Sequence, residues 1–169
     1  FGALLKVRPT VELQIFWWKT IQAECSHSGM INNSVLHLKI MNKEIEEEFV
    51  RTFVTKDKRS RALYLLSKDE NDTKYRAELL YKMSFIHIWF KEHCITKISV
   101  PIPTNQTVLD ILKAKGASER CYAITPYHEE TDGTEMLLAD ALDVVVGYGP
   151  AIIYCKPKKL AYFEDEQSY

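Results

Sequence analysis

Residues 95–102 begin the pattern that most strongly constrains how this chain folds. Ile98, Val100 and Ile102 alternate with more polar neighbours, so the large apolar groups share one face. This period of two predicts a half-buried strand. Two prolines, Pro101 and Pro103, close the stretch, and because proline lacks a backbone N–H we expect ladder pairing to end there.

A helix is predicted directly after this strand. Thr107 is a suitable N-cap residue, and four apolar residues follow it at helical spacing: Val108, Leu109, Ile111 and Leu112. Gly116 fits the position after the last turn, where glycine adopts a left-handed conformation at little cost. The stretch therefore predicts a strand, a short loop and an amphipathic helix with one buried face.

The residues upstream predict a partner strand. Met83–Phe90 is rich in β-branched and aromatic residues, and Lys91–Cys94 is a short polar connection, which together favour an antiparallel hairpin with the strand at 95–102. A single long helical stripe is the alternative, because Tyr75, Leu79, Met83, Ile86 and Phe90 also recur at helical spacing.

The residues downstream predict a sheet built largely from short strands. In chain order we expect a strand at Arg120–Tyr127, an acidic turn at Glu129–Gly133, a short strand at Glu135–Leu138, an irregular connection at Ala141–Gly149, a last strand at Ala151–Cys155 and a basic exit at Lys156–Lys159. The order is strand, strand, helix, strand, short strand, strand.

Over residues 81–159 this order resembles a ubiquitin-like β-grasp domain and is most similar to the Ras-association type. The residues that carry the resemblance are the expected hairpin, VPIPTNQTVLDIL at 100–112, CYAITPY at 121–127 and GPAIIYCKP at 149–157. The resemblance implies an α+β fold in which a mixed sheet packs on one main helix. It also implies a role as a non-enzymatic interaction module in signalling, an adaptor that binds a small GTPase.

The resemblance further implies where such a partner docks. In that family the second strand lies at the sheet edge and pairs with an edge strand of the GTPase, whose surface is acidic. Carried onto this chain, the partner-binding residues are Lys91, His93, Lys97 and Lys113. Charged side chains on an edge strand also serve simply to prevent aggregation, and that alternative stays open.

The N-terminal part lies outside the resemblance and is expected to be a mainly helical segment, residues 1–73, packed against the β-grasp domain. Helices are predicted at Glu44–Phe53 and Arg61–Ser67, and a helix is favoured over a strand for Val11–Cys25. The hydrophilic residues 67–73 are the expected boundary, and residues 160–169 are expected to form an acidic tail.

The composition of the chain narrows the classes of protein to which it can belong. The chain has 169 residues, of which 46% are apolar and 27% charged, and its formal charge is −1. These values are typical of a globular domain, and they argue against a nucleic-acid module, which normally carries a basic excess. The sequence contains no apolar run of the roughly 20 residues that a membrane span needs.

The cysteines and the glycosylation triplets are compatible with two cellular locations. Cys25, Cys94, Cys121 and Cys155 are widely spaced and form no metal or redox motif, which favours a cytoplasmic protein with free thiols. Three N-glycosylation triplets, which begin at Asn32, Asn71 and Asn105, keep a secreted or lumenal glycoprotein domain with disulfides as the alternative.

Catalytic motifs are absent from the sequence. It has no phosphate-binding glycine loop, zinc-protease helix or nucleophile elbow, and we expect no cofactor and no metal. His128, Glu129 and Glu130 are better explained as a solvated acidic loop than as metal ligands. A small enzyme whose site comes from separated parts of the chain is a further alternative.

Overall fold

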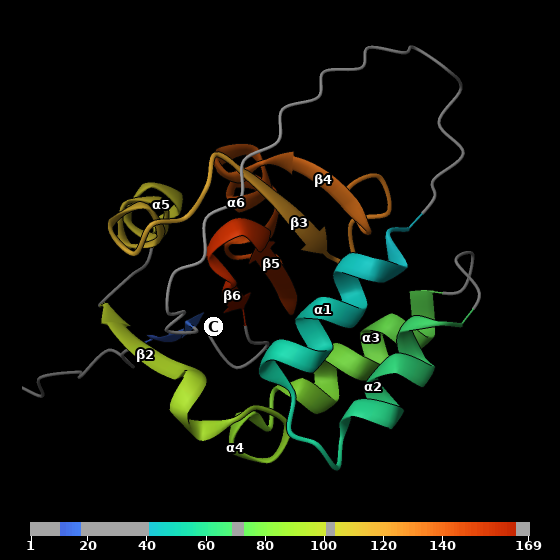
Figure 1. Cartoon of the computed structure of the whole chain (residues 1–169). Helices are drawn as coiled ribbons and strands as arrows, with labels where there is room; N and C mark the ends of the chain where they lie inside the picture. The colour runs from blue at the N-terminus through green and yellow to red at the C-terminus, as the bar shows by residue number, and fades with distance from the viewer. Residues whose placement is uncertain (1–10, 18–40, 69–72, 101–103, 165–169) are drawn as a thin grey trace, which may run out of the picture.

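The computed structural model describes residues 11–17, 41–68, 73–100 and 104–164. Within them the protein has an α+β fold, in which a six-stranded sheet lies between two layers of helices (Figure 1). The strands are β1 (Val11–Trp17), β2 (Ile95–Val100), β3 (Arg120–Ile124), β4 (Thr134–Leu137), β5 (Ala151–Cys155) and β6 (Leu160–Glu164).

The strand order across the sheet is β2-β1-β6-β5-β3-β4, and all five pairings are antiparallel. We expected a mixed sheet, and that expectation is wrong for the described strands. The reason is the hairpin of β5 and β6, because β6 turns back from β5 and enters the sheet between β5 and β1. β2 and β4 are the two edge strands.

β1 was expected to be the start of a helix at Val11–Cys25, and this expectation is wrong for residues 11–17. The strand is held on both sides, since its backbone pairs with β2 from Val11↔Val100 to Phe16↔Ile95 and with β6 from Gln14↔Phe163 to Trp17↔Leu160. The β-branched and aromatic residues of β1 suit a strand, and pairing on both sides decides between the two states.

One face of the sheet is covered by four helices, α1 (Lys43–Phe53), α2 (Arg59–Leu66), α3 (Thr73–Met83) and α4 (Ile86–Trp89). The Asn42 side chain caps α1 by accepting from the backbone N–H of Ile45 at 3.3 Å. The helix predicted at Glu44–Phe53 is confirmed, and Ile45, Phe49 and Phe53, which recur at helical spacing along one face, are buried. They pack on sheet residues that include Tyr154 and Phe163.

The expected strand at Met83–Phe90 is wrong, and with it the hairpin proposed between that segment and β2. α3 runs to Met83, a turn follows, and α4 occupies Ile86–Trp89. Leu79, Met83, Ile86 and Phe90 are all buried, at intervals of three or four residues. The helical stripe considered as the alternative is therefore what packs against the sheet, and β1 is the strand that pairs with β2.

The opposite face is covered by α5 (Asn105–Ala114) and α6 (Leu138–Val145). α5 follows β2 as predicted, and Gly116 after it has the expected positive φ of 89°. The N-cap is Thr104 rather than Thr107, because Thr104 is extended and its hydroxyl accepts from the backbone N–H of Thr107 at 3.2 Å. Val108 and Leu112 of α5 are buried.

Two elements near the C-terminal end differ from expectation. The segment Ala141–Gly149, expected as an irregular connection, contains most of α6, whose buried side chains Leu138, Ala141, Leu142 and Val145 share one helical face. The expected acidic tail at 160–169 contains β6, in which all five residues are buried. Lys159 has a positive φ of 46° and turns the chain back from β5 into β6.

Candidate functional site

The predicted docking strand, β2, lies at an edge of the described sheet. Among the described strands its only neighbour is β1, and the backbone of Lys97 pairs with that of Gln14. His93 precedes the strand in a 3-10 turn, Glu92–Cys94, and its side chain is exposed.

Lys91 is engaged within the molecule. Its Nζ donates to the backbone carbonyls of Arg51, at 3.0 Å, and of Thr52. These carbonyls lie in the last turn of α1, where a cation is favoured. Burial lowers the pKa of Lys91, and the nearby charge of Arg59 lowers it further. Lys91 thus stabilises the end of α1 and is not presented to a partner.

Lys113 lies on the other side of the sheet from Lys91. It is on α5, is half-buried, and forms an ion pair with Glu119. α5 packs on the face opposite to that covered by α1. The structure therefore separates the four predicted residues: Lys97 lies on β2 and His93 in the turn before it, whereas Lys91 contacts α1 on one face of the sheet and Lys113 lies on α5 on the other.

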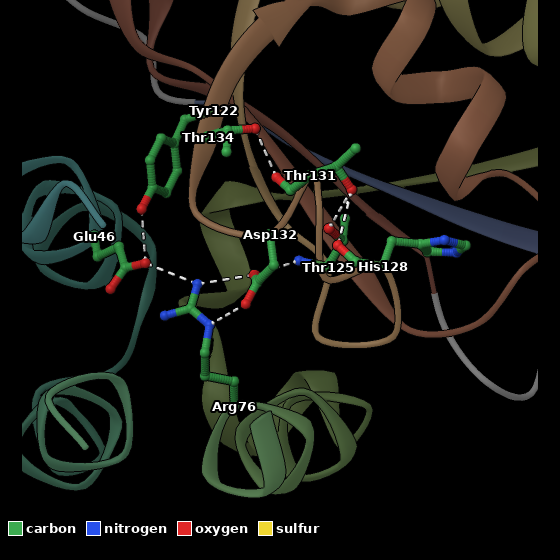
Figure 2. A network of polar contacts seen from close by, with 8 residues as sticks. All are labelled: Glu46, Arg76, Tyr122, Thr125, His128, Thr131, Asp132 and Thr134. Carbon is green, nitrogen blue, oxygen red and sulfur yellow. Dashed lines mark hydrogen bonds and ion pairs between the residues drawn. The ribbon is translucent and has the colours of Figure 1, made fainter. Parts of the chain in front are cut away.

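A buried polar network joins the helical layer to the sheet, and we call Glu46, Arg76, Tyr122 and Asp132 the Arg76 network (Figure 2). Arg76 of α3 pairs with Glu46 of α1 through Nη2 and Oε1 at 2.8 Å, and with Asp132 through Nε and Oδ2 at 2.7 Å. All three charged side chains are at most 3% exposed. Two carboxylates thus share one guanidinium in the protein interior.

Tyr122 of β3 completes the network by donating its hydroxyl proton to Glu46 Oε1 at 2.8 Å. Burial raises the pKa of Tyr122, and the charge of Glu46 raises it further. Burial acts to lower the pKa of Arg76, but the charges of Glu46 and Asp132 outweigh it and raise that pKa. The network therefore holds Arg76 charged and Tyr122 neutral.

Asp132 also organises the loop between β3 and β4. Its Oδ1 accepts from the backbone N–H of Thr125 at 2.8 Å, and the carbonyl of His128 accepts from the N–H of Thr131 and of Asp132. Gly133 follows with a φ of 70°, and a Cβ at this position would lie 2.7 Å from Met41 Cγ. As Figure 2 shows, the His128 ring points away from Arg76, while Asp132 points toward it.

The Arg76 network is better suited to holding structure than to catalysis. Each carboxylate is paired with Arg76 and bonded to a further donor, so neither is poised to exchange a proton with a substrate. No group of three or more His, Cys, Asp or Glu side chains in the described part of the chain is arranged to hold a metal ion. We assign the network the role of fixing α1, α3 and the β3–β4 loop to one another.

Two hollows lie near the network. One, of about 290 Å³, lies between α1 and α2 and is lined by Glu46, Ser60 and Tyr64 among others. The other, of about 360 Å³, lies where β3 begins and β5 ends, and Tyr122 and Cys121 line it. Glu46 lines the first hollow and Tyr122 lines the second, and their side chains are hydrogen-bonded to each other. The network therefore provides neither hollow with a carboxylate or hydroxyl that is available for acid–base chemistry.

The described cysteines are free thiols. Cys94, Cys121 and Cys155 are buried and unbridged, and Cys25 lies outside the described residues. Burial raises the pKa of Cys155 to about 11 and also raises that of Cys121. Such thiols are poor nucleophiles at neutral pH. Of the three glycosylation triplets only that at Asn105 is described, and the Asn105 side chain donates to Asp143 of α6 at 2.7 Å.

Sequence reasoning missed the Arg76 network. It placed Asp132 and Gly133 in an acidic turn and Glu46 on a helix, and the helical stripe considered as an alternative from Tyr75 onward includes Arg76. It had no reason to bring these residues together. The available signal was an aspartate beside a glycine at a turn between two strands, where the carboxylate can accept from backbone N–H groups.

Comparison of the chain with known proteins identifies no relative. No family model matches the chain, and neither a curated protein nor a solved structure matches it. In the described residues, no helix combines the length and the apolar character that crossing a membrane requires.

Proposed function

We propose that this protein is a non-enzymatic interaction module that binds a partner protein by strand addition along β2. The observation that carries the proposal is the place of β2 at the edge of the described sheet, with β1 as its neighbour on one side. An edge strand has backbone N–H and C=O groups that an extended segment of another protein can pair with.

The succession of elements supports a β-grasp type of domain. β1 and β2 are antiparallel neighbours, α5 follows on one face, and β3, β4 and β5 complete the order strand, strand, helix, strand, short strand, strand. The first strand is Val11–Trp17, so the helical layer α1–α4 is inserted between the first two strands. β6 is an additional strand beside β1.

A small GTPase is the first candidate partner, because the resemblance names an acidic GTPase surface as what the second strand meets. Lys97 and His93 are the basic positions that lie on β2 or directly before it. Lys91 and Lys113 are left out of the proposed surface, since each is engaged inside the molecule. Backbone pairing supplies affinity, and charge complementarity raises the association rate.

The test is binding to a panel of small GTPases, each loaded with GDP or with a GTP analogue. We expect saturable binding to one nucleotide state of one member, and we expect Lys97→Glu to weaken it mainly through a slower association rate. Raising the salt concentration should slow association of the wild type in the same way.

Lys158→Glu is the matched control, because this exposed lysine lies beyond β5 in the turn Lys156–Lys158. Equal effects of the two reversals would indicate diffuse charge instead of a docking strand. Amide signals of residues 95–100 should also shift on binding in an NMR titration. If they do not shift, the partner does not pair with β2.

A further inference from the structure

We infer that Cys121 and Cys155 form a reversible disulfide bond when the folded protein meets a low-molecular-weight disulfide such as oxidised glutathione. The two residues lie on β3 and β5, which are neighbours in the sheet. The inference goes beyond the proposed function, because it concerns covalent modification of two buried side chains and not the edge strand β2.

The register of the sheet places the two cysteines opposite each other. β3 and β5 are antiparallel, and their pairing includes Tyr122↔Tyr154. Cys121 and Cys155 lie one step further along the two strands, and each is still within its strand. Directly opposed residues of antiparallel strands have Cα atoms about 4.5–5.5 Å apart. A disulfide joins Cα atoms about 4.4–6.8 Å apart, so the backbone of the free thiol form already has the required spacing.

The side chains of the two cysteines also lie on the same face of the sheet. Cys121 and Cys155 are both buried in the core that α5 and α6 form with the sheet. Burial raises the pKa of Cys121, and the neighbouring Cys155 thiol raises it further. Cys94, by contrast, is buried in the core on the opposite face. Among the three described cysteines, the sheet therefore leaves open only the pairing of Cys121 with Cys155.

The pair lies at an end of the β3–β5 ladder that can open. Cys155 is the last residue of β5, and the exposed turn Lys156–Lys158 follows it directly. Strand ends open locally at a lower cost than unfolding of the whole domain. Burial raises the pKa of both thiols, so exchange is slow while the strands are paired. Brief opening of the strand end supplies the thiolates, and closure brings the two sulfur atoms together.

The exchange takes place in two steps. The thiolate of one cysteine attacks a sulfur of glutathione disulfide, which forms a mixed disulfide and releases one glutathione thiolate. The thiolate of the other cysteine then attacks the protein sulfur of the mixed disulfide, which forms the Cys121–Cys155 bond and releases a second glutathione thiolate. Two electrons pass from the protein to glutathione, and the two released glutathiones take up the two protons of the protein thiols. An excess of reduced glutathione reverses both steps.

The bridge closes residues 121–155 into a loop that contains β4 and α6. A cross-link of this kind restricts the unfolded chain much more than the folded chain, in which the two residues are already neighbours. Oxidation should therefore stabilise the protein, and the native fold should in turn favour formation of the bridge.

The experiment incubates the full chain in glutathione buffers that range from fully reduced to fully oxidised, until the thiol content is constant. The remaining thiols are alkylated in denaturant, and the protein is digested with a glutamate-specific protease. Cleavage after Glu129 and Glu135 separates Cys121 from Cys155, and the other two cysteines lie on further fragments. We expect mass spectrometry to find the fragments of Cys121 and Cys155 joined to each other, and a reductant to release them.

The equilibrium constant for bridge formation should be at least about thirtyfold larger in the native protein than in urea, as expected for a cross-link that fits the native geometry. Cys94→Ala is the matched control, because Cys94 is also buried but lies on the other face of the sheet. This variant should keep the bridge, whereas Cys121→Ala should lose it. The oxidised wild type should also unfold at a higher temperature than the reduced wild type.

Four free thiols in fully oxidised glutathione would overturn the inference. A bridge that involves Cys94 or Cys25 in the native protein would overturn it too. Equal equilibrium constants with and without urea would show that the two cysteines meet only by chance. An oxidised protein that unfolds at a lower temperature than the reduced one would show that the bridge distorts the sheet, which contradicts the native spacing on which the inference rests.

Discussion

Arg76 and Asp132 lie 56 residues apart in the sequence and form an ion pair in the protein interior, with 2.7 Å between Nε and Oδ2. Asp132 is fully buried and Arg76 is 3% exposed. A second contact, in which Nη2 donates to Oδ1 at 3.0 Å, makes the interaction bidentate. This geometry gives α3 a defined position relative to the β3–β4 loop.

Arg76→Ala should destabilise the protein by about 3–5 kcal/mol, because it leaves the carboxylates of Glu46 and Asp132 buried without a cation. The measurement is the free energy of unfolding in urea at neutral pH. Adding Glu46→Gln and Asp132→Asn to this variant should recover part of the loss, since the unpaired charges are then removed.

Arg61→Ala is the control for this prediction. Arg61 pairs with Glu78 at the same distance, 2.8 Å, that separates Arg76 from Glu46, but its side chain is half exposed. An exposed pair contributes below about 1 kcal/mol. If both arginine variants lose the same stability, burial of the Arg76 network is not what makes it important.

Gly133→Ala should destabilise the protein more than Gly116→Ala does. Both glycines have positive φ, which by itself disfavours alanine by about 1 kcal/mol. At Gly133 the added Cβ would also lie 2.7 Å from Met41 Cγ, whereas at Gly116 the nearest atoms, on Lys158, are 3.9 Å away. Equal losses of unfolding free energy would show that Met41 moves aside freely.

Leu112→Ala should cost about 2–5 kcal/mol of unfolding free energy. Leu112 is 1% exposed in the core between α5, α6 and the sheet, so truncation removes packing and leaves a cavity. Leu137→Ala is the comparison, because Leu137 is 47% exposed and should change stability little. A small effect at Leu112 would mean that α5 is not firmly packed on the sheet.

Stability should fall as the pH rises from about 9 to about 11. Burial raises the pKa of Cys155 from its usual 9.0 to about 11, so across this range the folded thiol stays protonated while the unfolded thiol ionises. The folded state then binds more protons, and through Cys155 alone each unit of pH in this window lowers the unfolding free energy by up to about 1.4 kcal/mol. Cys155→Ala should flatten the decline, measured by urea unfolding at several pH values. An unchanged slope would contradict the assignment.

The parts of the fold that could be predicted are those specified by neighbours in sequence. The stripe of Ile45, Phe49 and Phe53 predicted α1, and the run Ala151–Cys155 predicted β5. β1 could not be predicted in this way, since a strand needs partners and those of β1 are β2 and β6, far along the chain. Met83–Phe90 shows the opposite case: its β-branched and aromatic residues favoured a strand, and packing at helical intervals overrode that preference.

The candidate sites show the same difference between features specified by neighbours in sequence and features that depend on distant residues. Lys97 was placed on a strand by local alternation, and β2 is that strand. Lys91 could not be recognised as a cap of α1, because the carbonyls that it binds belong to residues about 40 positions earlier. The rings of His128 and Tyr148 are in contact although β4 and α6 lie between their loops in the chain, so neighbours in sequence could not predict this contact.

The insertion of β6 between β1 and β5 has a consequence for how the chain reaches its native state. Trp17 and its partner Leu160 are 143 positions apart in the sequence, and loop closure over such a distance slows folding. During synthesis from the N-terminus, β1 and β5 both emerge before the strand that joins them. Until β6 arrives, each has an open flank that another nascent chain can pair with. β6 is the last of the described strands in chain order, and it completes the sheet between β1 and β5. Assembly therefore competes with aggregation until β6 is in place.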